Sequence, residues 1–122
     1  PNDSIAIGVI SALKSAGYGS SDKPFPIITG QDADIASVKA IVAGEQSQTV
    51  FKDTRVLADR AAGMVDAILK GEEVEVDDTE TYDNNEKVVP SYLCEPVSVD
   101  ITNYKEALID SGYYTEDEIG VE

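Results

Sequence analysis

Apolar residues recur at helical spacing in three segments of the chain, and this pattern sets the first expectations. The spacing predicts a helix over residues 4–16, a second over 34–43, and a third from 53 or 54 to 69. A glycine, the residue type favoured just after a helix, follows each segment: Gly17, Gly44 and Gly71. In the third helix the apolar stripe is expected to face a core, with Met64 as a packing residue. The stripe consists of Leu57, Ala61, Met64, Val65 and Ile68.

Two short apolar runs lie between these helices and predict strands. Ile27 and Ile28 are typical of a fully buried strand, and residues 48–52 are rich in β-branched and aromatic types. The order helix, strand, helix, strand, helix with short loops is typical of a parallel sheet. The sequence therefore predicts an α/β fold of three layers, with a mostly parallel sheet and helices on both faces.

The character of the chain changes after Gly71, so we expect one region over residues 1–71 and another over 72–122. The second region opens with an acidic connection, followed by a hairpin that turns at residues 83–85. Residues 92–99 are expected to be an extended edge or crossing segment, because prolines at 90 and 96 disfavour a central strand. A short helix over 104–110, capped by Thr102 or Asn103, completes the region.

Charge and composition exclude several classes of function. The net charge of −15 opposes binding to nucleic acid or to an anionic membrane surface. The chain has no histidine and one cysteine, and the acidic residues 72–80 do not match calcium-loop spacing, so no metal or cofactor is expected. Cys94 is expected to be a small buried hydrophobe. Because the chain begins at Pro1 without Met, we expect it to be a piece of something longer.

Polar residues with complementary chemistry are expected at one rim of the predicted sheet. Asn2 and Asp3 precede the first helix, Gln31 and Asp32 follow the first strand, and Lys52 ends the second. Helix starts and strand carboxyl ends share one rim in this architecture. An amide, a carboxylate and an ammonium together suit hydroxyl groups, which both donate and accept hydrogen bonds. The simpler alternatives are that Asn2 and Asp32 (or Asp34) only cap helices and that Lys52 is merely solvated.

Several of these segments resemble one known family. Residues 2–8, 29–34 and 48–52, and then 81–84, 88–93 and 110–115, are similar to the C-terminal domain of type I periplasmic sugar-binding proteins of ABC transporters. The likeness is greatest to the xylose-binding and multiple-sugar-binding branch. It runs through nearly the whole chain, with the motifs in order.

The resemblance implies a binding protein and not an enzyme. In that family two domains close on a monosaccharide, such as xylose, glucose or galactose, and the closed form is presented to a membrane permease. Asn2, Asp32 and Lys52 occupy positions that hydrogen-bond the sugar, with Asp3 and Gln31 as supporting or capping groups. The family's N-terminal domain, which supplies the rest of the site, is absent from this chain. The resemblance also implies a periplasmic or extracellular location, with a cell-surface lipoprotein as one form.

Two other functions are weighed against this one. A sugar-responsive repressor, or a chemosensory or two-component system in which a sensor protein is the partner, can use the same fold, but this chain has no basic DNA-reading helix. A phosphoryl-acceptor domain would need paired carboxylates at a first strand end, whereas Asp32 stands on a middle strand without such a pair.

Overall fold

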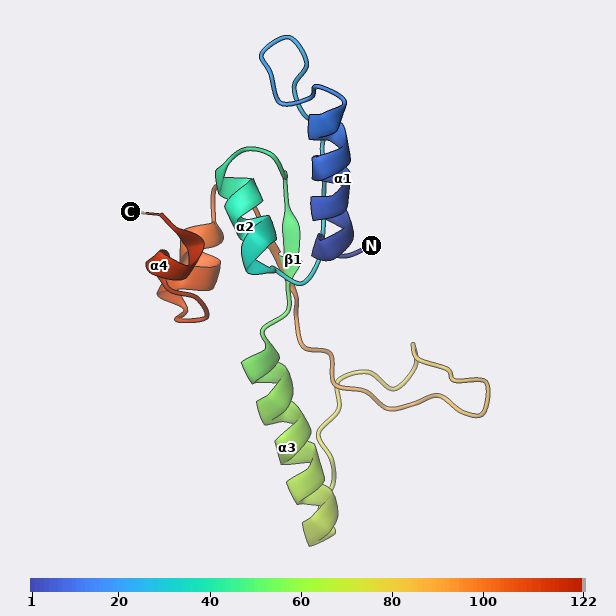
Figure 1. Cartoon of the computed structure of the whole chain (residues 1–122). Helices are drawn as coiled ribbons and strands as arrows, with labels where there is room; N and C mark the ends of the chain where they lie inside the picture. Colours follow the sequence, from blue (N-terminus) through green and yellow to red (C-terminus); the bar gives the residue numbers. More distant parts are fainter. Residues whose placement is uncertain (122) are drawn as a thin grey trace. The chain divides into compact units, whose positions relative to one another are not determined.

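The computed structural model describes residues 1–121. The elements along the chain are α1 (Asp3–Ser15), α2 (Ile35–Val42), β1 (Thr49–Phe51), α3 (Thr54–Lys70), β2 (Val97–Val99), the π-helix η1 (Lys105–Asp110) and α4 (Glu116–Ile119) (Figure 1). They form two compact units, one from residues 1–52 together with those from 96 onward, and one from residues 53–95. The boundary expected at Gly71 therefore falls inside the second unit, and α3 belongs with the acidic segment that follows it.

The parallel pairing expected between the first two strand segments is present in the first unit. Thr29 and Gln48 form a parallel bridge. Three backbone hydrogen bonds of 2.8–2.9 Å run along it: Ser47 donates to Ile28, Gly30 to Gln48, and Asp32 to Val50. On its other side β1 pairs antiparallel with β2, Thr49 opposite Val99 and Phe51 opposite Val97. The prediction of an α/β fold with a parallel pairing is confirmed, with an antiparallel strand added after residue 95.

The prediction that Ile27 is buried is wrong. Ile28 is 7% exposed, whereas Ile27 is 86% exposed. Successive side chains of an extended segment point to opposite faces. Ile28 packs with Ala6 and Ile10 of α1 and Ala40 of α2, while no element of residues 1–121 covers Ile27.

The main core of the first unit joins residues that are distant in the sequence. Ala33, Val38 and Phe51 pack with residues from β2 and the C-terminal helices, which are Val99, Tyr104, Leu108 and Ile119. Tyr113 meets Phe51 edge-on, with ring centroids 4.6 Å apart. The C-terminal segment is therefore part of the same core as the two parallel segments, and Tyr113 packs against that core.

The C-terminal helices differ from expectation. The short helix expected over 104–110 is a π-helix that begins at Lys105, and its N-cap residue is Tyr104, so neither Thr102 nor Asn103 caps it. Both residues serve a tight turn instead, since the Asp100 carboxylate accepts from Thr102 and the Asn103 amide oxygen accepts from the Asp100 N–H. The sequence analysis did not anticipate α4, which begins with a capping box between Thr115 and Glu118.

The second unit consists of α3 and the extended segment after it. Asp53 caps α3 by accepting a hydrogen bond from the Arg55 N–H, as one of the two predicted caps. The hairpin is also confirmed: Asp83 bridges Val88 antiparallel, and Asn85 has a φ of +71° at the turn. The core role predicted for the α3 stripe is wrong, because none of the residues of α3 is buried. Met64 is half-buried and Ile68 is 64% exposed.

Across residues 1–121, no helix combines the length and apolar character that crossing a membrane requires.

Candidate functional site

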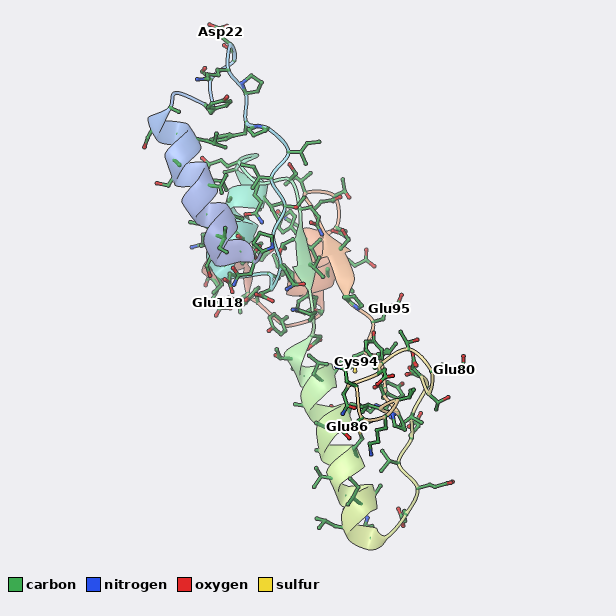
Figure 2. All side chains as sticks on the ribbon, turned by 90° about the vertical axis from the view of Figure 1, so that its right-hand side faces the viewer. Asp22, Glu80, Glu86, Cys94, Glu95 and Glu118 are labelled. Atoms are coloured by element: carbon green, nitrogen blue, oxygen red, sulfur yellow. The ribbon has the colours of Figure 1, made fainter. Side chains whose placement is uncertain are left out.

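The polar residues that the sequence singled out come together at one end of the first unit. The start of α1, the turn before α2 and the end of β1 all lie at this end (Figure 1). The loop after α1, with Asp22 at its tip, lies at the other (Figure 2). The backbone N–H of Asp3 donates to the carbonyl of Gln31 at 2.9 Å, which ties the start of α1 to the turn.

The turn has an unusual backbone. Asp32 and Ala33 have φ values of +104° and +56°, a region that non-glycine residues rarely adopt. Such residues cost about 1–3 kcal/mol each and persist where the surroundings fix them. Here the Asp32 N–H donates to Val50 at 2.8 Å, and the Ala33 N–H donates to the Thr49 hydroxyl at 3.2 Å. The parallel neighbour therefore holds both strained residues in place.

Asp3 is the centre of a buried polar network beneath the turn. Its side chain is fully buried, and its carboxylate accepts from the Thr49 hydroxyl at 2.9 Å, the Gln46 amide at 3.1 Å and the Asp34 N–H at 2.9 Å. The Gln46 amide oxygen accepts in turn from the Ser37 hydroxyl at 2.9 Å. Because every polar group in this network has a partner, the burial of the carboxylate is compensated. The network joins α1, the turn, α2 and β1.

Gly30 lets the backbone of the turn approach this network. Its φ is not in the left-handed region, so its role is to leave space. A side chain there would collide with the Asp3 carboxylate.

Asp32 and Lys52 form an ion pair at the surface. The Lys52 Nζ lies 2.9 Å from Oδ1 of Asp32, and their side chains are 41% and 38% exposed. Each follows one of the two parallel segments, as the sequence predicted. Both groups remain accessible to solvent, so both can exchange part of this contact for a ligand. A pair at this exposure contributes at most about 1 kcal/mol to stability.

The side chains of Asn2 and Asp32 do not cap the helices. Asn2 occupies the N-cap position of α1 but its side chain makes no capping hydrogen bond. The N-cap residue of α2 is Asp34, also without a side-chain bond, and Asp32 lies outside the helix. Gln31 contributes its carbonyl to the turn while the residue itself is exposed. The side chains of Asn2 and Asp32 are therefore not committed to capping these helices.

Electrostatics at this end favour the neutral form of two nearby groups. Burial, and then the charges of Asp3 and Asp32, raise the pKa of the Asp34 carboxyl. Burial first, and then its neighbours Tyr113 and Asp34, raise the pKa of the Tyr114 hydroxyl. That hydroxyl donates to the carbonyl of Ala33 at 3.0 Å.

Sequence reasoning missed several residues that build this end of the molecule. Gln46 and Ser37 were not singled out, and the hydrogen bond from Tyr114 to the turn was not anticipated, although all three are bonded to the turn or to the network beneath it. A polar residue in a helix or loop looks the same in sequence whether it is buried or solvated. Asp3, in contrast, was among the predicted residues, because it directly follows Asn2 at a helix start.

Comparisons with known proteins agree with this architecture. The multiple sugar-binding periplasmic protein SbpA of Azospirillum brasilense is 60% identical over 116 residues, covering 95% of this chain and 32% of that protein. The D-xylose-binding periplasmic protein of Haemophilus influenzae is 39% identical, covering 97% and 34%. A solved ABC transporter solute-binding protein from Clostridium phytofermentans, with bound β-D-glucose, is 58% identical with a TM-score of 0.87, covering 97% and 35%.

This chain spans about a third of the length of these relatives. The family model for the periplasmic binding protein domain matches residues 1–73, more than half of the chain. With the relatives above, this match confirms the resemblance that residues 2–8, 29–34 and 48–52 suggested. The chain belongs to the periplasmic binding protein domain family.

Proposed function

We propose that this chain is part of the monosaccharide-binding subunit of an ABC transporter and supplies one wall of its sugar site. The ligand is a sugar such as xylose, glucose or galactose. Asn2, Asp32 and Lys52 hydrogen-bond it, while Asp3 and Gln31 support them from behind. The chain carries out no catalysis.

The observation that carries this proposal is the Asp32–Lys52 ion pair beside the start of α1. It puts a carboxylate and an ammonium 2.9 Å apart, both partly exposed, next to a helix start whose asparagine amide makes no capping bond. Relatives at 60% and 58% identity are a multiple sugar-binding protein and a solute-binding protein with bound glucose.

The chemistry of the three groups fits neighbouring sugar hydroxyls. A hydroxyl that lies between Asp32 and Lys52 can donate to the carboxylate and accept from the ammonium at the same time. Bonds to charged partners are the stronger kind, and their loss in a closed site is expensive. The ion pair holds both side chains near this geometry before the sugar arrives, which lowers the entropy cost of binding.

The remainder of the site lies in the part of the protein that this chain does not include. A single wall leaves a small polar ligand open to water, which competes for each hydrogen bond. We propose that an N-terminal domain closes over the sugar and that the permease recognises the closed form. The names of the relatives support a periplasmic location, and attachment by lipid to a cell surface is one form that this takes.

Titration calorimetry with xylose, glucose and galactose tests the proposal, with the 122-residue chain compared with the full-length protein. We expect the full-length protein to bind at least one of these sugars tightly. The chain alone should bind none with a Kd below about 1 mM, which is roughly −4 kcal/mol. No sugar binding by the full-length protein would overturn the proposal. Micromolar binding by the chain alone would overturn the two-wall arrangement.

A further inference from the structure

We propose that Tyr114 is a positioning residue, which holds the strained turn that carries Asp32. The inference rests on the proposed function, because it concerns the side chain that we assign to the sugar. Tyr114 lies between η1 and α4, 81 residues along the chain from Ala33, yet its hydroxyl donates to the Ala33 carbonyl at 3.0 Å.

The turn depends on this contact because of where Ala33 lies. Ala33 is fully buried, so water does not readily replace the tyrosine hydroxyl as a donor to its carbonyl. The positive φ of Asp32 and Ala33 is unfavourable, and hydrogen bonds on both sides of Ala33 hold it. Thr49 bonds the N–H of Ala33, and Tyr114 bonds its carbonyl. Thr49 and Tyr114 thus bond the two polar backbone groups of Ala33, the residue next to Asp32.

The tyrosine itself is well fixed. Its backbone N–H donates to the carbonyl of Leu108 at 2.8 Å, and its ring meets that of Tyr113 edge-on at 4.9 Å. Tyr113 in turn packs against Phe51, the last residue of β1. The burial that raises the pKa of Tyr114 also keeps its hydroxyl protonated and able to donate. A hydroxyl held this way can set the position of the carbonyl to which it donates.

The test removes the Tyr114 hydroxyl alone and compares the effect with that of the same change at a matched tyrosine. Tyr114→Phe keeps the ring and its packing. Tyr104→Phe is the control, since Tyr104 belongs to the same core and, among residues 1–121, its hydroxyl makes no hydrogen bond to the turn. In the full-length protein, hydrogen–deuterium exchange of peptides covering residues 29–36 and sugar affinity are measured for both variants.

We expect Tyr114→Phe to speed exchange in the turn and to weaken sugar binding, each by roughly 2- to 10-fold, the value of one lost hydrogen bond. Tyr104→Phe should change neither. Unchanged exchange and affinity in Tyr114→Phe, or equal losses in both variants, would overturn the positioning role while leaving the proposed function intact. A wild-type protein that binds no sugar would overturn both.

A second measurement covers the case in which Tyr114→Phe does not fold. The 13C chemical shift of the Ala33 carbonyl in the wild-type protein reports on the hydrogen bond that it accepts. When alkaline pH ionises Tyr114, the hydroxyl can no longer donate, so this shift should follow the titration of the tyrosine. A chemical shift of the Ala33 carbonyl that does not change as Tyr114 titrates would overturn the positioning role of Tyr114.

Discussion

Gly30 lies so close to Asp3 that a Cβ atom added to the glycine would overlap Oδ1 of the buried carboxylate. No rotation of a small side chain relieves such an overlap, so the buried carboxylate itself must move and give up hydrogen bonds. We therefore expect Gly30→Ala to lower the free energy of unfolding by roughly 2–4 kcal/mol. Urea unfolding followed by circular dichroism measures this change.

The matched control for Gly30 is Gly8, in the middle of α1. A Cβ there meets nothing within 4 Å. Gly8→Ala should therefore raise stability by about 0.5–1 kcal/mol through helix propensity alone. Equal effects of the two substitutions would contradict the close approach of Gly30 to Asp3.

Asp34 is expected to make stability depend on pH. Its pKa is raised above the ordinary value of 3.8, first by partial desolvation of the carboxyl and then by the charges of Asp3 and Asp32. Folding therefore favours the protonated form. That contribution is complete below the unfolded pKa and is lost as pH rises through the folded pKa, so at neutral pH the charge opposes folding.

Asp34→Asn removes this charge while keeping an equally good N-cap residue. We expect the variant to be more stable than wild type at pH 7, by no more than a few tenths of a kcal/mol because the residue is exposed. The advantage should vanish well below the ordinary carboxyl pKa, where wild type is protonated too. Urea unfolding at the two pH values measures it, and an advantage that grows on acidification would show that the sign is wrong.

Substitution of Asp32 should separate binding from stability in the full-length protein. Asp32→Asn keeps the shape and tolerates a positive φ, but it exchanges one acceptor for a donor. Sugar affinity should fall by roughly 30- to 1000-fold, or 2–4 kcal/mol, while stability changes by less than about 1 kcal/mol. Asp32→Ala should lose the same affinity and somewhat more stability, because alanine is strained at a φ of +104°. Calorimetry and thermal melting together decide, and full affinity in Asp32→Asn would remove Asp32 from the proposed site.

Metal removal is expected to have no effect. Among residues 1–121, no group of three or more His, Cys, Asp and Glu side chains is arranged to hold a metal ion. Thermal melting with and without EDTA should give the same Tm for the chain and the same sugar affinity for the full-length protein. A Tm that falls by several degrees with EDTA would reveal a metal site.

The parts of this structure that the sequence predicts are those encoded by local patterns. The helix spacing, the glycine stops and the apolar segment before Gly30 were enough to place Asp32 and Lys52 at neighbouring strand ends, and the structure pairs them at 2.9 Å. The failures concern burial that depends on distant partners. Ile27 and the α3 stripe have apolar patterns that no described element covers, and Tyr114 reaches Ala33 across 81 residues. Periodicity identifies an apolar face but does not say what lies against it.

The pairing of β1 with β2 has a consequence for how the chain acquires its structure during synthesis. The two strands are neighbours in space, with Phe51 opposite Val97, but the whole second unit is made between them. The core that contains Ala33 and Phe51 is completed only by Val99 and by side chains that follow it. A nascent chain that ends before β2 therefore exposes half a core and an unpaired strand edge to solvent and to other chains. The segment that ends at Phe51 should depend on protection from aggregation until β2 and the core residues that follow it have emerged from the ribosome.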